Sequence, residues 1–159
     1  MKKVYIYSIL ALFCCCMTAE ADTKITSPNG QITVSLRTGA EGLGWTVSQA
    51  GKEVYTESDV SVRMGETVLG STNKAKGIKQ RSAQETIRPV VPLKFAEINY
   101  SYNEATINYG SYQVLLRVMD NGVAHRFVMN LKGDVEITDE KFSLRPANGF
   151  KANYQTCGS

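Results

Sequence analysis

The stretch that decides the fold runs from Tyr112 to Asn130: Tyr-Gln-Val-Leu-Leu-Arg-Val-Met, then Asp-Asn-Gly, then Val-Ala-His-Arg-Phe-Val-Met-Asn. Two β-rich runs flank Asn121-Gly122, a pair that tolerates the positive φ angles of a tight type I′ hairpin turn. A two-residue loop at this pair gives one apolar face, which includes His125, and places Arg117 opposite Arg126. Because like charges destabilise a sheet, this pair needs a carboxylate between its members, solvent around them, or an anionic or hydroxyl-rich ligand.

The rest of the chain repeats the same alternation of strand and turn. Strands are expected at 31–36, 43–48, 53–55, 60–64, near 78, and at 84–88, 93–102, 106–109, 135–138 and 142–144, with a long loop over 69–81. Turn residues separate these runs at intervals of about a dozen residues, which is typical of a sandwich. No segment keeps a 3.6-residue period over three turns. The sequence therefore predicts an all-β antiparallel sandwich.

The first 21 residues have the pattern of a secretory signal peptide. Lys2 and Lys3 precede the apolar run 4–17, and Ala19-Glu20-Ala21 is a small-x-small cleavage site. We therefore expect an exported, periplasmic chain that starts at Asp22. A membrane anchor is the alternative, although the run is shorter than the ~20 residues of a span. Lipid attachment is another, although Phe13, Cys14 and Cys15 precede the candidate cysteines where a small residue is usual.

Charge and cysteine content exclude several classes of function. Only Cys157 lies outside the leader, so no internal disulfide is possible in the mature chain. The net charge is +3, and the basic cluster Lys74, Lys76, Lys79 and Arg81 lacks interleaved aromatic residues. We expect a solvated loop there and no nucleic-acid partner.

Four segments occur in an order that resembles a known family: Ile25–Val34, Trp45–Val54, Tyr100–Glu104 and Leu116–Phe127. Over about Thr23 to Arg145 the chain resembles the N-terminal domain of glycoside hydrolase family 97, the retaining and inverting α-glucosidases and α-galactosidases of Bacteroidetes. The expected domains are a signal peptide over 1–21, an incomplete family 97 N-terminal-like sandwich over 22–147 and an irregular tail over 148–159. His125 departs from the Phe or Tyr expected at its position.

The resemblance implies a galactose-mutarotase-like β-super-sandwich that packs on a catalytic (β/α)8 barrel and closes part of its cleft. It also implies calcium in the full-length enzyme, with a carboxylate ligand from the N-terminal domain that should fall beyond Ser159. No catalytic, cofactor-binding or metal residue is therefore assigned to this chain, and no cofactor is expected in it. We expect a chain that is inactive alone, whose possible ligands are α-glucans or α-galactosides.

The residues themselves offer candidates for chemistry without a diagnostic spacing. Glycoside hydrolysis needs two carboxylates across one cleft, and the candidates are Glu85, Glu97, Glu104, Asp120, Glu136, Asp139 and Glu140. Glu104 is the most interesting, as a structural partner for Arg117 or Arg126. His125 is the only histidine, so a zinc site is not expected.

Two classes of function remain open. The first is a non-catalytic accessory domain of a secreted α-glycosidase. The second is a free-standing carbohydrate-binding or envelope interaction module. Its sugar platform would be formed by exposed aromatic rings, with Trp45, Tyr100, Tyr102 and Tyr109 as candidates, although alternation along the strands favours their burial.

Overall fold

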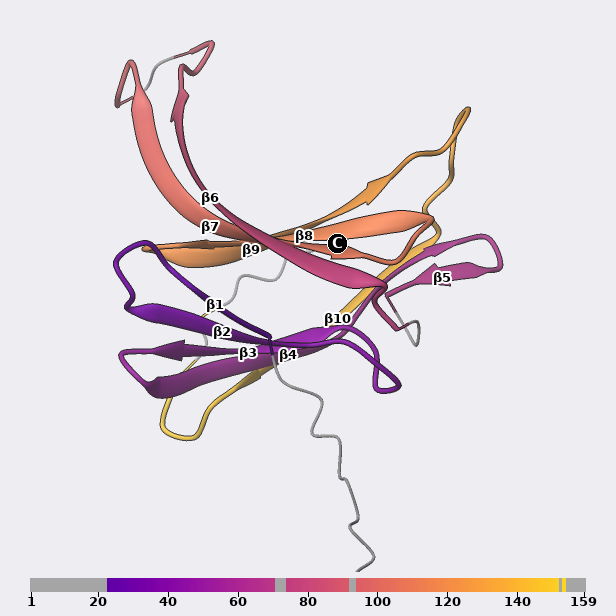
Figure 1. Ribbon diagram of the computed structural model, residues 1–159, viewed down its shortest axis with the longest axis horizontal. Coiled ribbons are helices and arrows are strands. Elements are labelled where there is room, and N and C mark those ends of the chain that lie inside the picture. The colour runs from indigo at the N-terminus through magenta and orange to yellow at the C-terminus, as the bar shows by residue number, and fades with distance from the viewer. Residues whose placement is uncertain (1–22, 71–73, 92–93, 152, 154–159) are drawn as a thin grey trace, which may run out of the picture.

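The computed structural model describes residues 23–70, 74–91, 94–151 and 153, and these form two packed antiparallel sheets (Figure 1). The predicted leader and Cys157 lie outside these residues. The first sheet contains β1 (Thr23–Thr26), β2 (Ile32–Arg37), β3 (Gly44–Gln49), β4 (Lys52–Met64), β5 (Thr67–Leu69) and β10 (Asp139–Pro146). The second contains β6 (Gly77–Ile87), β7 (Ile98–Asn108), β8 (Tyr112–Met119) and β9 (Gly122–Met129). The predicted all-β sandwich is confirmed.

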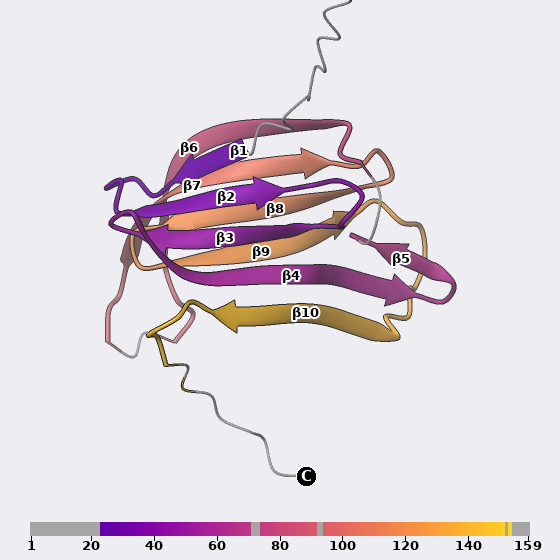
Figure 2. The same cartoon turned by 90° about the horizontal axis from the view of Figure 1, so that it is seen from below.

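Most neighbouring strands are consecutive in the sequence, and the exception is β10, which returns to pair with β4. The first sheet runs β1-β2-β3-β4-β10, with β5 also paired to β4, and the second runs β6-β7-β8-β9. Figure 2 shows the strands of the first sheet lying over those of the second, with the two sets running in nearly the same direction. The described part contains no helix long and apolar enough to cross a membrane.

The core lies between the two sheets because apolar residues alternate along the strands. In β8 the inner face carries Val114, Leu116 and Val118, which are fully buried, while Leu115 and Arg117 lie on the outer face. The opposing sheet contributes Val34, Leu36, Trp45 and Val60 to the same cluster. Burying a side chain of this size stabilises the fold by about 1.5–3 kcal/mol.

The hairpin at the centre of the sequence forms in a different register from the predicted one. Met119 pairs with Gly122, so the two-residue loop is Asp120-Asn121, one residue earlier than expected. Neither Asn121 nor Gly122 has a positive φ, so the turn is not type I′. Arg117 faces Ala124, and the predicted Arg117–Arg126 pair is wrong. The predicted division of residues between the two faces of the hairpin is nonetheless correct, because the observed and predicted registers differ by an even number of residues.

Strand lengths also differ from the sequence prediction, because pairing partners decide them. Residues 53–64 form one strand rather than two, with Asp59 at φ 59° where its pairing with β10 is irregular. The predicted loop over 69–81 ends at Gly77, since every residue of β6 pairs with β7. The predicted strand at 135–138 is absent, because this segment crosses between sheets. There Thr138 N donates to Arg63 O at 3.0 Å.

The edge strand β10 extends the first sheet beyond the cover of the second. Leu144 pairs with Glu57, whose carboxylate points between the sheets, yet Leu144 is half exposed. The second sheet ends at β9, and Figure 2 shows β10 outside it. An apolar strip of the inner face is therefore left open to solvent along this margin.

Candidate functional site

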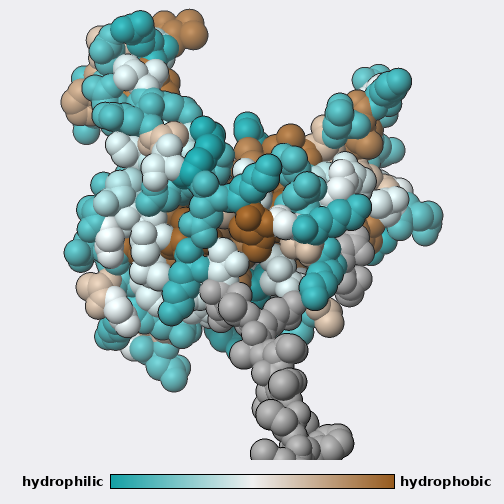
Figure 3. Space-filling model, in the orientation of Figure 1, coloured by the Kyte–Doolittle hydropathy of each residue, from teal (hydrophilic) through white to brown (hydrophobic). Residues whose placement is uncertain are grey.

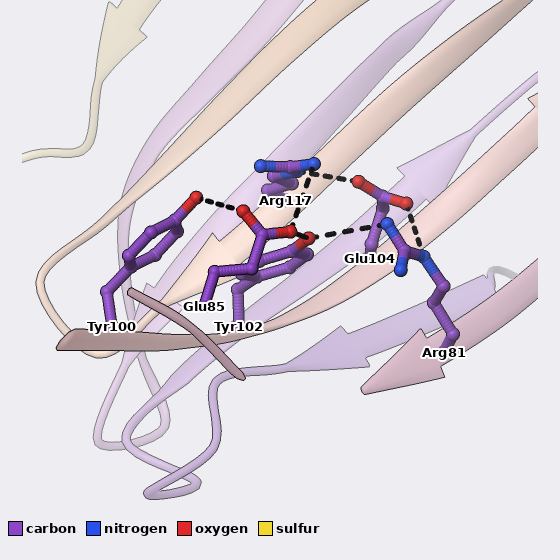
Figure 4. A network of polar contacts seen from close by, with 6 residues as sticks. All are labelled: Arg81, Glu85, Tyr100, Tyr102, Glu104 and Arg117. Atoms are coloured by element: carbon purple, nitrogen blue, oxygen red, sulfur yellow. Dashed lines mark hydrogen bonds and ion pairs between the residues drawn. The ribbon is translucent and has the colours of Figure 1, made fainter. Parts of the chain in front are cut away.

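A cluster of six polar and aromatic residues occupies the outer face of the second sheet, away from the core. The polar cluster consists of Arg81, Glu85, Tyr100, Tyr102, Glu104 and Arg117 (Figure 4). Its basis is strand register, because Arg81 faces Glu104 across β6 and β7, and Glu104 faces Arg117 across β7 and β8. One carboxylate is thus held between two guanidinium groups in a single row.

Glu104 is the centre of the row. Arg81 Nε donates to its Oε1 at 2.8 Å, and Arg117 Nε donates to its Oε2 at 2.6 Å. Although it lies on an outward face, its side chain is only 2% exposed. A buried carboxylate is tolerated only when paired and hydrogen-bonded, and these contacts meet that requirement.

Glu85 binds the two tyrosines beside this row. Tyr100 Oη donates to Glu85 Oε2 at 2.6 Å, and Tyr102 Oη donates to Glu85 Oε1. The two rings stack with centroids 5.6 Å apart. The guanidinium of Arg117 lies 4.1 Å from the centroid of Tyr102, and it covers this ring, which is itself fully buried. The cation and the aromatic face attract each other, so Arg117 links the two halves of the cluster.

The electrostatics keep both carboxylates ionised. Burial by itself would raise the pKa of Glu104, but hydrogen bonds from Arg81 and Arg117 and their charges outweigh it and lower that pKa. Hydrogen bonds from Tyr100 and Tyr102 lower the pKa of Glu85. A general acid must hold its proton near neutral pH. Neither carboxylate meets that condition.

Glu57 is the carboxylate with the opposite shift, and it lies between the sheets. Burial raises its pKa, and the nearby His125 opposes this effect. His125 Nδ1 is 3.8 Å from Glu57 Oε1, and its ring lies 5.0 Å from that of Trp45. This places His125 on the inner face, as predicted. Both side chains are largely buried and lie against Trp45, so the arrangement is a packing feature.

The other predicted residues are scattered. Glu97 pairs with Arg88 at 2.7 Å, Asp120 accepts from Asn29 N at 2.9 Å, and Asp139 lies 4.0 Å from Lys141. Glu136 and Glu140 are exposed. Among the described residues, no three His, Cys, Asp or Glu side chains are grouped to hold a metal ion.

The structure differs from the sequence prediction at two members of the cluster, Arg81 and Glu85. The predicted partnership of Glu104 with Arg117 is confirmed. The sequence predicts a solvated loop for Arg81 and offers Glu85 only as one candidate carboxylate among seven, whereas the structure places both in the cluster. The available signal was their spacing of four in a strand, which puts both side chains on one face. It was hidden because β6 lacks apolar alternation.

The aromatic residues do not form an exposed platform. Trp45, Tyr102 and Tyr109 are buried, and Tyr100 is partly buried with its hydroxyl bound to Glu85. The prediction that alternation buries these rings in the core is confirmed for Trp45 and Tyr109, whereas Tyr102 is buried on the outer face beneath Arg117.

Comparisons with known proteins give one family and several solved structures of similar fold. Residues 25–158 match the family described as Glycosyl-hydrolase 97 N-terminal. The fold is similar to a Glycoside Hydrolase Family 97 enzyme from Pseudoalteromonas sp. strain K8 solved with acarbose, with a TM-score of 0.61 and 18% identity over 74% of this chain and 19% of that one. It is also similar to a beta-arabinopyranosidase, with a TM-score of 0.63 and 19% identity over 75% of this chain and 20% of that one.

No curated protein matches the chain significantly. The chain spans about a fifth of the length of these solved structures. Identities this low support the fold alone, while the family assignment rests on the match over residues 25–158. On that match, and on a two-sheet sandwich of the same fold, the chain belongs to glycoside hydrolase family 97 as its N-terminal domain.

Proposed function

We propose that this chain is a non-catalytic accessory domain of an exported glycoside hydrolase and that it packs against the catalytic domain of that enzyme. The observation that carries the proposal is the family match over nearly the whole described chain. The solved relatives are enzymes about five times as long, so most of each relative lies outside the matched domain. Export is supported by Lys2, Lys3 and the apolar run that follows them.

The chemistry of the polar cluster supports an inactive domain. Retaining and inverting glycosidases pair a protonated carboxylic acid with an ionised carboxylate across the sugar. Here Glu104 and Glu85 both have lowered pKa values, and their four oxygens already accept hydrogen bonds from Arg81, Arg117, Tyr100 and Tyr102. For the same reason, these carboxylates do not fit a calcium ion, the metal implied for the full-length family.

An independent sugar-binding module is less consistent with the structure. Such modules stack a sugar ring on an exposed aromatic side chain. The candidate rings of Trp45, Tyr102 and Tyr109 are buried, and Tyr100 stacks on Tyr102 instead. The relatives include an enzyme solved with acarbose and a beta-arabinopyranosidase. The ligand of the first and the name of the second therefore point to different sugars, and neither is assigned to this domain.

Activity of the purified chain tests the proposal. Residues 22–159 should show no activity on 4-nitrophenyl α-glucoside, α-galactoside or β-arabinopyranoside. The release of 4-nitrophenol should equal that in buffer alone. Calorimetric titration with acarbose or maltotriose should show no saturable binding. The control is the double variant E85Q/E104Q, which should give the same background. Turnover by the wild-type chain above the rate of buffer would overturn the proposal, and saturable acarbose binding would favour the module.

A further inference from the structure

Three Asn-Gly pairs occur in the sequence, at residues 29–30, 121–122 and 148–149. This dipeptide is prone to deamidation, because glycine has no side chain to hinder attack by its backbone nitrogen on the preceding side-chain amide. The reacting groups are therefore identical at the three positions. What differs among them is how the structure holds the amide and the nitrogen.

Deamidation needs only the chain and water. The glycine N attacks the asparagine Cγ, a C–N bond forms, and the side-chain nitrogen leaves as ammonia with the proton of the attacking N–H. Water then adds to either carbonyl of the succinimide ring and opens it. The products are aspartate and isoaspartate, in which the backbone continues through the former side chain and is longer by a carbon. Hydrogen bonds to the amide or from the glycine N–H oppose the first step, because both groups must move to meet.

Asn29 is held in a conformation that opposes this attack. Its Oδ1 accepts hydrogen bonds from Ser27 Oγ at 2.7 Å and from Gln31 N at 2.9 Å. The nitrogen that would attack, Gly30 N, donates to Ser27 O at 2.9 Å. In addition, Asn29 N donates to Asp120 Oδ1 at 2.9 Å. Asn29 is therefore protected although its local sequence is reactive.

Asn121 lies in the β8–β9 turn without such restraints. It is exposed, and its side chain makes no hydrogen bond with any described residue. Figures 1 and 2 place this turn at the left end of the molecule, beside the β1–β2 turn. Figure 3 shows mostly hydrophilic and near-neutral residues at that end, so water reaches the turn. A turn at the end of a hairpin also opens locally with little loss of free energy.

Asn148 provides an unrestrained reference within the same chain. It is exposed, and its side chain makes no hydrogen bond with any described residue. It follows β10, which ends at Pro146, so a change at this position disturbs no strand pairing.

We propose that Asn121 is a site of spontaneous deamidation in the folded chain, and that isoaspartate formed there loosens the junction between the β8–β9 and β1–β2 turns. The two turns meet through the hydrogen bond from Asn29 N to Asp120. Each turn contains an Asn-Gly pair, but the structure protects the pair at 29–30 and leaves the pair at 121–122 open to hydrolysis.

The loosening follows from the length of the loop. The β8–β9 loop has two residues, Asp120 and Asn121, between the paired residues Met119 and Gly122. Isoaspartate at position 121 adds a backbone carbon to this loop, so the flanking pair cannot keep the observed geometry and Asp120 moves away from Asn29. The new carboxylate also lies beside Asp120, but repulsion between exposed charges is screened by solvent and salt. The longer backbone is therefore the main effect.

Peptide mapping measures the three sites separately, because trypsin releases them in different peptides, residues 25–37, 118–126 and 142–151. The purified chain is incubated at mildly alkaline pH, and the mass change from NH2 to OH is followed in each peptide. Asn121 should react at least about tenfold faster than Asn29, because hydrogen bonds restrain both Asn29 and Gly30. In guanidinium chloride the three rates should agree within about threefold, since only the shared dipeptide remains. Asn148 should react in both states.

Two variants separate the site from its consequence. G122A should slow deamidation at Asn121 severalfold, because the methyl group hinders the attacking nitrogen, and should leave the rate at Asn148 unchanged. A Cβ at Gly122 meets nothing within 4 Å, so this variant keeps the fold. N121D has the charge of the product on a backbone of normal length, and its thermal unfolding midpoint should equal that of the wild type. The wild-type fraction that contains isoaspartate, isolated by ion exchange and identified by peptide mapping, should unfold at least about 3 °C lower.

Three results would overturn the inference. Equal rates at Asn29 and Asn121 in the folded chain would show that the hydrogen bonds around Asn29 give no protection. An unmodified Asn121 in a folded chain whose Asn148 has reacted would show that the β8–β9 turn is itself protective. An unfolding midpoint of the isoaspartate fraction equal to that of the wild type, or one lowered equally in N121D, would remove the effect assigned to the longer backbone.

Discussion

At the scale of single residues, the fold tolerates a buried carboxylate on an outward-facing strand position. Glu104 is hidden by the side chains that neutralise it, since Arg81 and Arg117 bind one oxygen each and Arg117 also lies over Tyr102. Removing one partner from such a group leaves the other charges without compensation. The cost of a substitution here therefore depends on the contacts around the residue and not on its strand position alone.

The Glu104→Gln substitution tests this account. It should lower the free energy of unfolding by about 2 kcal/mol, because two charge-assisted hydrogen bonds lose their ionised acceptor. The control is E97Q, which breaks the exposed Glu97–Arg88 pair and should cost less than about 0.5 kcal/mol. Urea denaturation of both variants measures the difference. Equal losses would show that burial adds nothing to the Glu104 pairing.

Two stacked tyrosines give a second contrast between neighbouring residues. The rings of Tyr109 and Tyr112 lie 4.6 Å apart, but their hydroxyls differ. Tyr112 Oη accepts a hydrogen bond from Gly70 N at 2.8 Å, while Tyr109 Oη is buried with no partner in the described part of the chain. Burial accordingly raises the pKa of Tyr109 to about 12.

Y109F should therefore be neutral or stabilise the fold by up to about 1 kcal/mol, since it removes an unsatisfied polar atom. Y112F should destabilise it by about 1–2 kcal/mol, because the buried N–H of Gly70 loses its acceptor. Thermal unfolding monitored by circular dichroism orders the two variants. A larger loss in Y109F than in Y112F would mean that the Tyr109 hydroxyl has a partner.

At the scale of elements, strand pairing selects the turn rather than the reverse. The β8–β9 loop is Asp120-Asn121, and Gly122 is the first residue of β9. Asp120 also accepts a hydrogen bond from Asn29 N, which ties this turn to the β1–β2 turn in the other sheet. This long-range contact accompanies the observed register. It cannot be inferred from the local sequence Asn121-Gly122.

The Gly122→Ala substitution separates the two registers. In a type I′ turn at Asn121-Gly122 a methyl group would be strained, at a cost of about 1–2 kcal/mol. In the observed turn Gly122 lies outside the left-handed region and a Cβ there meets nothing within 4 Å, so G122A should change stability by less than about 0.5 kcal/mol.

Gly70→Ala is the contrasting variant for that experiment. Gly70 has φ +86°, and a Cβ there would lie 2.2 Å from Val60 O. G70A should therefore cost at least about 2 kcal/mol. Chemical denaturation of both variants provides the measurement, and a large loss in G122A would restore the type I′ assignment.

At the scale of the whole molecule, the carboxylates give stability opposite dependences on pH. The folded-state pKa values of Glu104 and Glu85 lie below the ordinary 4.5, so their contribution is present above pH 4.5 and is lost as the pH falls further. The folded-state pKa of Glu57 lies above 4.5, so its contribution is present below pH 4.5 and is lost as the pH rises through the folded value.

We therefore expect the urea midpoint of the wild-type chain to fall between about pH 5 and pH 3. In E104Q the urea midpoint should fall less steeply over this pH range, since the glutamine side chain does not take up a proton there. E57Q should raise the midpoint near neutral pH relative to the wild type and have little effect in acid. The same pH profile for E104Q and the wild type would contradict the assignment of acid sensitivity to Glu104.

Much of this architecture follows from local sequence. Period-two alternation in residues 32–36, 44–49 and 112–118 determined the strands, their buried faces and the all-β class, because apolar side chains on one face must leave water. The same alternation placed Trp45, Val114 and Leu116 in the core and put Arg117 on the outer face. The segment order also pointed to the family that the comparison with residues 25–158 shows.

Only the tertiary structure decided the hairpin register, the length of β6 and the polar cluster. The observed register is accompanied by contacts such as Asn29 with Asp120, which are 91 positions apart in the sequence. The length of β6 depends on its pairing with β7, and that pairing also brings Arg81 and Glu85 to Glu104, Tyr100 and Tyr102. Local sequence carries no record of such pairings, because the energy of a cross-strand contact depends on both strands at once.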